Sequence, residues 1–464
     1  MPDYSFAKGH EIAAAVARGE VSARTVVEDA LSVIRSRDQT LNAFTDVTAE
    51  RALARADAVD SDRTASKPMG PLAGVPFAVK NLFDVQGFPT RAGSKINRDL
   101  PPAAHDSPLI EKLEAAGAIL VGALNMGEYA YDFTGDNVHD GPSRNPHDVN
   151  RMSGGSSGGS GSAVGGGLVP LALGSDTNGS IRVPSSFCGI FGLKPTYGRL
   201  SRARSFPFVV SFDHLGPFAR CTRDLAISYD AMQGFDPHDG GSADRPAEPS
   251  LPQLDRGIDG LRIAVAGGYF RKGAFPEALR AIEQVAKALN VSREIELPEA
   301  QRARAAAYLI TTTEGAALHL DRLRQRAHDF DPTTRDRLIA GTMIPSSLVM
   351  KAQKFRRWYR EQVLALFRDV DVILAPATPC TAPAIGQQTF MLDGVEMPVR
   401  PNIGIFTQPI SFIGLPVVAA PVPLNPLPIG VQVIAPPWRE DIALRVAQHL
   451  EEMGAVVAPR PPLS

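Results

Sequence analysis

The chain reads RMSGGSSGGSGSAVGGGLVPLALGSDTNGSIRVP from Arg151 to Pro184, a segment far richer in glycine and serine than the rest of the sequence. Glycine at this density lets backbone approach backbone or ligand closely, and the hydroxyls offer nucleophiles and hydrogen bonds. A flexible linker has a similar composition. However, the apolar run 168–173 lies inside the segment, and its glycine boundary is typical of a buried strand. We therefore predict that this segment lies in the interior and carries the chemistry.

The composition is that of a globular protein without a preference for polyanions. Hydrophobic residues make up 44% of the 464 residues and charged residues 21%, which allows a large buried core. The 48 basic and 50 acidic residues leave a formal net charge of -2, so the chain lacks the positive surface that binds nucleic acid or an anionic membrane. We expect a small-molecule partner, with no role for nucleic acid or membrane.

The cysteines and the N-terminal sequence bear on the cellular compartment. Cys188, Cys221 and Cys380 are widely spaced and form no paired metal-ligand pattern, which is typical of reduced thiols in a cytoplasmic protein. The first residues carry charges, such as Asp3 and Lys8, and no long apolar run. We therefore expect a cytoplasmic protein with neither a signal peptide nor a transmembrane span.

Helix and strand patterns alternate along the chain, which is typical of an α/β fold. Helical spacing of apolar residues occurs at 22–37, 48–60, 107–116, 276–290, 346–368 and 440–453. Short apolar runs predict strands at 77–79, 118–121, 260–265, 371–374, 417–420 and 430–434. The Pro-, Gly- and Asp-rich stretch 236–260 is the best candidate for a long surface connection. Because both sides of it share one pattern, we predict a single domain over 1–464, with N-terminal helices over about 1–65.

Two serines of the Gly/Ser-rich segment are candidate nucleophiles, Ser156 and Ser180. A serine hydroxyl is a weak nucleophile at neutral pH and needs a base within hydrogen-bond reach. Residues 154–158 fit the G-x-S-x-G nucleophile elbow, which requires a preceding strand, a following helix and a downstream histidine. Such a match arises easily in a segment of this composition, and the preceding stretch 139–147 has a loop-like sequence. We therefore expect a base other than histidine.

Lys80 is the better candidate base. It follows the apolar run 75–79 and precedes Leu82 and Phe83, which predicts a partly desolvated amine. Burial lowers the pKa of a lysine from about 10.4 by up to several units, and the neutral amine can then act as a general base. A structural ion pair between Lys80 and Asp84 is the alternative that the sequence leaves open.

Three separated motifs resemble those of the amidase signature family. They are PFAVKNLFDV at 76–85, GGSSGGS at 154–160 and GSDTNGSIRVP at 174–184. The resemblance continues through 187–196 and reaches 414–416, so it covers most of the chain. It implies a mixed central β-sheet covered by helices on both faces. It also implies an enzyme that cleaves a linear C–N amide bond of a small molecule and needs neither a cofactor nor a metal.

The resemblance assigns roles to the motif residues. It makes Ser180 the nucleophile that forms the acyl-enzyme, Lys80 the base, and Ser156, which follows a cis peptide bond, the relay for protons between them. The oxyanion hole is expected from the backbone N–H groups of Thr177, Asn178, Gly179 and Ser180. The family usually has glycine at the position of Asn178, so this chain adds a polar side chain beside the hole. Asp176 and Arg182 are expected to brace the loop.

The substrate pocket is less well specified than the catalytic set. The residues after 125–128 are expected to line it, and two more come from positions where related subunits place residues of a glutamine pocket. The candidate lining residues are Tyr129, Ala130, Asp132, Tyr308 and Arg337. Substrate in this family is set by variable loops, so the motifs alone do not name the amide.

Three functional classes of the family compete. A glutaminase subunit of a tRNA-dependent amidotransferase is expected to carry an aspartate three residues before the threonine matched by Thr407, where this chain has Gly404. A catalytically silent amide-binding protein would not need the intact set of Lys80, Ser156 and Ser180. The sequence therefore favours an active small-molecule amidase, and the glutaminase subunit is the alternative.

A finer resemblance points to the carboxybiuret hydrolases of the family. It rests on AGSKIN at 92–97, NPHD at 145–148, FDHLGP at 212–217 and the motif that contains Asn178. It implies a small polar, urea-like amide as substrate, an oligomer and a short helical partner subunit. His139 and His147 are eight residues apart in a loop without a cysteine or acidic ligand pattern, so we expect no zinc site.

Overall fold

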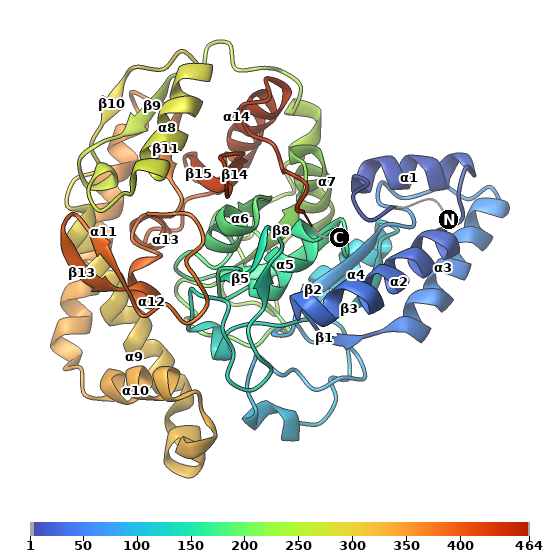
Figure 1. Cartoon of the computed structure of the whole chain (residues 1–464), viewed down its shortest axis with the longest axis horizontal. Coiled ribbons are helices and arrows are strands. Elements are labelled where there is room, and N and C mark those ends of the chain that lie inside the picture. Colours follow the sequence, from blue (N-terminus) through green and yellow to red (C-terminus); the bar gives the residue numbers. More distant parts are fainter. Residues whose placement is uncertain (1–3, 463–464) are drawn as a thin grey trace.

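The computed structural model describes residues 4–462, and one mixed sheet of 11 strands lies at its centre (Figure 1). In spatial order the strands are β1 (Phe44–Val47), β3 (Ile119–Leu124), β2 (Pro76–Lys80), β6 (Leu171–Asp176), β8 (His214–Ala219), β7 (Phe191–Lys194), β14 (Val417–Val422), β15 (Ile429–Ile434), β11 (Val372–Pro376), β9 (Ile263–Ala266) and β10 (Glu294–Ile295). β2 is parallel to β3 and β6, whereas β8 is antiparallel to β6. This architecture confirms the predicted α/β fold with a mixed central sheet.

Helices cover the sheet on both faces. They are α1 (Gly9–Arg18), α2 (Ala23–Leu41), α3 (Ala49–Thr64), α4 (Pro108–Ala115), α5 (Gly158–Gly165), α6 (Arg182–Cys188), α7 (Thr222–Met232), α8 (Pro276–Ala288), α9 (Ala300–Arg326), α10 (Pro332–Thr342), α11 (Ser346–Leu366), α12 (Val399–Asn402), α13 (Gln408–Ser411) and α14 (Glu440–Glu452). Every residue of β2, β3, β6, β7 and β8 is buried, so neither face of these strands meets solvent. In Figure 1 the blue helices α1–α3 lie at one side of the sheet and α9–α11 at the other.

The predicted helices and strands are present, with ends that differ by a few residues. Ser22 caps α2, because its side chain accepts a hydrogen bond from the N–H of Thr25 at 3.0 Å. The strand predicted in the apolar run 168–173 begins only at Leu171 and continues to Asp176, which carries it into the last of the three motifs. The stretch 236–260 contains one short 3-10 turn, Leu251–Gln253.

The surroundings of the elbow-like match differ from the expectation. The stretch 139–147, predicted to be a loop, contains the short strand β4 (Arg144–Asn145). β4 pairs with β5 (Asp148–Met152), and α5 begins just after Ser157. A strand and a helix therefore do flank residues 154–158, but this strand belongs to a separate two-stranded ribbon and not to the central sheet. A second such ribbon pairs β12 (Thr389–Leu392) with β13 (Val395–Pro398).

Glycine makes the central helix α5 possible. A Cβ atom at Gly159 would lie 2.5 Å from the carbonyl oxygen of Ala43 and 2.6 Å from that of Asn125. A real Cβ does not approach an oxygen so closely, so only glycine lets α5 pass against these two segments. The composition of the segment thus reflects close packing in the core.

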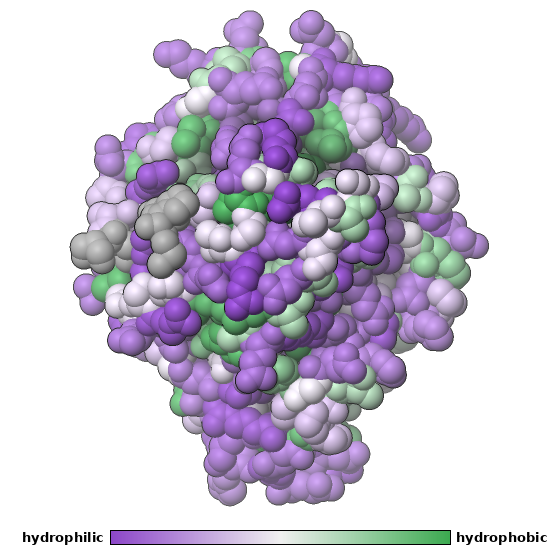
Figure 2. All heavy atoms as spheres, turned by 90° about the vertical axis from the view of Figure 1, so that its right-hand side faces the viewer, coloured by the Kyte–Doolittle hydropathy of each residue, from purple (hydrophilic) through white to green (hydrophobic). Residues whose placement is uncertain are grey.

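The face that carries α1–α3 is mainly hydrophilic. In Figure 2 the hydrophobic side chains of this face form small, separate patches between polar ones. Within residues 4–462, no helix combines the length and the hydropathy that a membrane crossing requires.

Candidate active site

Lys80 is the last residue of β2 and is fully buried. β2 and β6 are parallel neighbours, so their carboxyl ends meet at one edge of the sheet and bring Lys80 beside Ser175. The amine of Lys80 donates hydrogen bonds to Ser156 Oγ at 2.6 Å and to Ser175 Oγ at 2.9 Å. The alternative pairing with Asp84 is wrong, because that carboxylate accepts its hydrogen bond from Thr90 Oγ1.

The environment of Lys80 favours its neutral form. Burial lowers the pKa of the Lys80 amine to about 7, although the carboxylates of Asp213, Asp176 and Asp132 act in the opposite direction. Near neutral pH a large fraction of the amine is therefore unprotonated. A neutral amine held 2.6 Å from the hydroxyl of Ser156 can accept a proton from it.

Ser156 lies between β5 and α5, directly after the motif glycines. The peptide bond between Gly155 and Ser156 is cis. The backbone oxygen of Ser156 accepts a hydrogen bond from the N–H of Gly127 at 3.1 Å, and its hydroxyl faces Lys80. Ser156 is therefore fixed at both its backbone and its side chain.

Ser180 lies in the loop between β6 and α6, and its side chain lines a pocket. Its hydroxyl makes no hydrogen bond with any residue of 4–462. The backbone N–H groups of 177–180 likewise donate to no acceptor within that range, although all four residues are buried. Buried N–H groups are normally paired, so this loop presents donors that are ready for an oxyanion.

The conformation of this loop depends on Gly179 and Thr407. Gly179 has φ 147°, and a Cβ there would collide with Thr407 Oγ1. The same hydroxyl donates a hydrogen bond to the backbone oxygen of Asn178 at 2.7 Å. Thr407 thus holds the carbonyl side of the loop and leaves the N–H side free.

Asp176 and Arg182 form a buried pair below the loop. Arg182 Nε donates to Asp176 Oδ2 at 3.0 Å, and neither side chain is exposed. Arg182 also donates to Gln432 Oε1 at 2.6 Å and to the backbone oxygen of Thr407 at 3.1 Å. Burial alone would raise the pKa of the Asp176 carboxyl, but Arg182 holds that pKa well below its usual range. The contacts tie the loop to α13 and β15.

Replacement of Arg182 by methionine is expected to lower the free energy of unfolding by about 3 to 5 kcal/mol, because it leaves the charge of Asp176 buried without a partner. Chemical denaturation followed by circular dichroism measures this loss. Arg357→Met is the matched control, since Arg357 pairs with Glu361 on the exposed face of α11 and is expected to contribute little. Equal stability of the two variants would contradict a bracing role for Arg182.

The pocket beside Ser180 is narrow in the free chain, because only about 30 Å³ of it is open to the centre of a water molecule. Its walls come from the connections that follow β3, β6 and β7, and from the helices α9, α10, α12 and α13. The lining residues are Ala130, Tyr131, Asp132, Phe133, Thr177, Asn178, Ser180, Phe208, Tyr308, Thr311, Arg337, Pro401 and Gln408. Four of the five candidate lining residues are therefore placed at the pocket, and Tyr129 is not.

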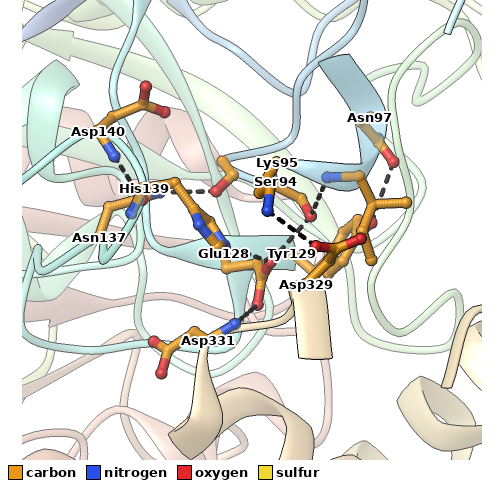
Figure 3. Close-up of polar contacts among 12 residues, drawn as sticks. Ser94, Lys95, Asn97, Glu128, Tyr129, Asn137, His139, Asp140, Asp329 and Asp331 are labelled. Atoms are coloured by element: carbon orange, nitrogen blue, oxygen red, sulfur yellow. Dashed lines mark hydrogen bonds and ion pairs between the residues drawn. The ribbon is translucent and has the colours of Figure 1, made fainter. Parts of the chain in front are cut away.

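Tyr129 lies behind the pocket wall. Figure 3 shows its ring pointing toward Asn97, to which its hydroxyl donates a hydrogen bond at 3.0 Å. The ring packs on His319 of α9, with 4.0 Å between the ring centroids. Positive φ values at Tyr129 (50°) and Ala130 (61°) turn the backbone, so that Tyr131 lines the pocket in its place.

Glu128 ties this pocket wall to α10 (Figure 3). Its buried carboxylate accepts hydrogen bonds from Ser94 Oγ at 2.8 Å and from the N–H of Asp331 at 2.7 Å. It also lies 3.0 Å from His139 Nε2. Because Asp331 immediately precedes α10, these contacts hold the helix that bears Arg337 against the loop after β3.

Three residues that contact Lys80 or the loop of Ser180 were not predicted from the sequence: Ser175, Asp213 and Thr407. Ser175 lies within the motif of the nucleophile, one residue before Asp176, so the motif itself held the signal. Asp213 precedes β8, which starts opposite the end of β6, and its carboxylate accepts a hydrogen bond from Thr177 Oγ1 at 2.6 Å. Asp213 lies in the motif 212–217 and Thr407 is the threonine matched with related subunits, but neither was assigned to the site, because only the folded sheet brings them to the loop.

The sequence is similar to those of known amidases, in agreement with a Lys–Ser–Ser site. The family model called Amidase matches residues 25–444. AtzE, the 1-carboxybiuret hydrolase subunit of Pseudomonas sp. (strain ADP), is 54% identical over 447 residues, 96% of this chain and 98% of that protein. A glutamyl-tRNA(Gln) amidotransferase subunit of Chromohalobacter salexigens is 37% identical over 95% of each chain.

Among solved structures, one is described as an unexpected vestigial protein complex that reveals the evolutionary origins of an s-triazine catabolic enzyme. It shares 53% sequence identity and a TM-score of 0.96 with this chain, and the match covers 97% of this chain and 100% of that one. The extent of these matches confirms the resemblance found in the three motifs. The chain belongs to the amidase family and is a hydrolase of linear carbon–nitrogen amide bonds.

Proposed function

We propose that the chain hydrolyses a small anionic, urea-like amide through an acyl-enzyme on Ser180. The observation that carries this proposal is the hydrogen bond of 2.6 Å from the Lys80 amine, whose pKa is about 7, to Ser156 Oγ. It gives the site a base at neutral pH without any histidine. The intact pair also argues against a silent amide-binding protein.

The acylation step follows from these positions. Neutral Lys80 accepts the proton of Ser156, and Ser156 accepts the proton of Ser180 as Ser180 Oγ bonds to the amide carbonyl carbon. The carbonyl oxygen becomes an oxyanion and accepts hydrogen bonds from the free N–H groups of 177–180. The C–N bond then breaks, the proton returns through Ser156 to the leaving nitrogen, and ammonia or an amine departs.

Deacylation uses the same groups in the same order. A water molecule gives a proton to the relay of Ser156 and Lys80 and adds to the acyl carbon. The ester bond to Ser180 breaks, Ser180 regains its proton, and the carboxylic or carbamic product leaves. Ser180 makes no hydrogen bond with Ser156 in the free chain, so substrate binding is expected to bring the two hydroxyls together.

Arg337 supports the choice of an anionic substrate. Its guanidinium lies 3.8 Å from the centroid of the Tyr131 ring and donates to the backbone oxygen of the same residue. Within residues 4–462 it forms no ion pair, and Asp132, the carboxylate of the pocket, pairs with Arg400 at 3.2 Å. A partly buried cation that forms no ion pair favours a ligand that brings an anion. The relative of 54% identity is named for carboxybiuret, which carries a carboxylate.

Replacement of Arg337 by methionine is expected to raise KM for an anionic amide such as succinamate by about 10- to 100-fold, because one charge-assisted contact is lost. KM for the neutral amide butyramide should change by less than about threefold. Release of ammonia measured across both substrates tests the proposal. An equal loss for the two amides would exclude an anion subsite at Arg337.

The glutaminase alternative is disfavoured by the packing at Gly404. A Cβ at this position would collide with the ring of Phe133, which lines the pocket. An aspartate for the ammonium group of glutamine therefore has no space there. Turnover of glutamine at rates above those for small amides would reverse this choice.

We also propose that the chain works in a cytoplasmic oligomer with a short helical partner subunit. The support is the similar structure described as a protein complex, together with three buried cysteines, all free. Mass measurement of the chain purified from its native host, compared with the chain expressed alone, tests the assembly.

A further inference from the structure

Asn178 presents an unused hydrogen-bonding atom at the pocket. Its side chain lines the pocket together with Ser180, and the residue is 7% exposed. Its Nδ2 donates to Thr311 Oγ1 at 2.9 Å, but its Oδ1 is buried and has no partner within residues 4–462. A buried carbonyl oxygen without a hydrogen bond costs about 1 to 3 kcal/mol, so such an atom calls for an explanation.

The carboxamide of Asn178 is held firmly. Thr407 fixes its backbone through the bond to the Asn178 oxygen at 2.7 Å, and Thr311 of α9 fixes the end of its side chain. The oxyanion donors belong to the same loop. The unused oxygen therefore has a set position relative to the carbonyl that Ser180 attacks.

The contacts of Asn178 lead to the proposed anion subsite. Thr311 is followed in α9 by Thr312, whose hydroxyl lies 2.8 Å from the hydroxyl of Tyr131. The guanidinium of Arg337 in turn packs on the ring of Tyr131. The wall that holds Asn178 is thus continuous with the proposed anion subsite. With the anion on the part of the substrate that stays on Ser180 after the amine has left, a group recognised by Asn178 belongs to that same part.

We propose that Asn178 determines specificity by accepting a hydrogen bond from an N–H attached to the scissile carbonyl on the retained side. Ureas have this N–H, whereas acyl amides have a carbon there. The inference rests on the proposed amide hydrolysis and extends it to a substrate class, N-carbamoyl compounds. A site that binds an N–H in this way rejects the analogue without it, because the acceptor is then left unpaired.

N-carbamoylglycine and succinamate provide a matched test. They are both anionic primary amides of nearly the same shape, and they differ by one NH against one CH₂ next to the scissile carbonyl. Wild-type protein is expected to favour N-carbamoylglycine in kcat/KM. In Asn178→Ala, kcat/KM for N-carbamoylglycine should fall by about 10- to 100-fold and that for succinamate by less than about threefold. Thr311→Val should also lower kcat/KM for N-carbamoylglycine more than that for succinamate, but by a smaller factor than Asn178→Ala. It removes the hydroxyl that holds the Asn178 carboxamide and leaves that carboxamide free to rotate.

Calorimetric binding of both compounds to Ser180→Ala, with and without Asn178→Ala, gives the same comparison without turnover. If Asn178→Ala changes kcat/KM and binding affinity equally for the two compounds, or changes neither, the proposed role of Asn178 is overturned. A selective effect of Asn178→Ala beside an unchanged Arg337→Met would leave this inference standing and remove the anion subsite. Binding and turnover of neither compound by the wild-type site would overturn the proposed substrate class and this inference with it.

Discussion

Ser180→Ala is expected to abolish amide hydrolysis, with kcat lowered by on the order of 10⁴-fold or more, because no other group can form the acyl-enzyme. The residual rate would come from binding and from the oxyanion donors alone. Release of ammonia from an excess of substrate measures the loss. Ser162→Ala is the matched control in the same Gly/Ser-rich segment, since that hydroxyl donates to the backbone oxygen of Arg144 and does not line the pocket.

Ser156 is the rival for the role of nucleophile, because it occupies the elbow-like match. The structure gives the two serines different surroundings: Ser156 is buried against Lys80, and Ser180 opens on the pocket. Mass spectrometry of a trapped acyl-enzyme is expected to place the acyl group on the peptide that contains Ser180. An adduct on Ser156, or substantial turnover by Ser180→Ala, would contradict the proposed mechanism.

The central part of the fold could be predicted because its signals are local. Short apolar runs bounded by glycine or proline predicted β2, β6 and β14 to within a few residues, and the helical spacing of apolar residues predicted α2. The order of the strands could not be read from these runs, because pairing of β7 with β14 joins segments more than two hundred residues apart. The elbow context was misjudged because β4 has only two residues and β5 has the polar sequence DVNRM, which contains no apolar run.

The candidate site divides in the same way. Lys80 and the two serines lie in motifs whose spacing carries the signal, and the parallel pair β2 and β6 brings the motifs together. The pocket wall depends on backbone turns and tertiary contacts, and no periodic pattern in the sequence predicts either of them. Left-handed φ values at Tyr129 and Ala130 turn the chain, so that Tyr131 lines the pocket where Tyr129 was expected. The packing of Phe133 against Gly404 depends on tertiary contacts, so the sequence alone did not reveal it.

Lys80→Met is expected to lower kcat by at least about 10³-fold, because the relay then has no base. The same change should stabilise the protein at low pH. The folded chain binds a proton on Lys80 only below a pKa of about 7, whereas the unfolded chain binds it up to about 10.4. Between these values the unfolded state holds more protons, so stability rises with pH, and below pH 7 the full cost of the buried charge is present.

Unfolding at pH 6 and pH 9 tests this linkage. Lys80→Met should exceed the wild type in stability at pH 6, and the difference should shrink at pH 9 as the wild-type amine becomes neutral. A variant that is less stable than the wild type at both pH values would contradict a charge penalty at Lys80. Loss of activity together with a gain in stability would separate a catalytic from a merely structural lysine.

The activity of the wild type is expected to rise with pH through about 7, because only neutral Lys80 can accept the proton of Ser156. Lys194 is also fully buried with a pKa lowered by burial to about 7, so the rise alone does not identify the base. The titrations of the two lysines can be distinguished through their neighbouring carboxylates, because Asp213 raises the pKa of Lys80 and Glu440 raises the pKa of Lys194.

Asp213→Asn should therefore move the rise in kcat/KM to lower pH, while Glu440→Gln should leave it in place. With its oxygen at the Oδ2 position, asparagine still accepts from the N–H groups of Phe208 and Val209, and its NH₂ group can donate to Thr177 Oγ1, so the loop retains its contacts while the charge is removed. A rise that follows Glu440 and ignores Asp213 would assign the titration to Lys194. A rise that moves with Asp213 alone would identify the amine beside Ser156 as the group that must lose its proton before Ser180 can attack.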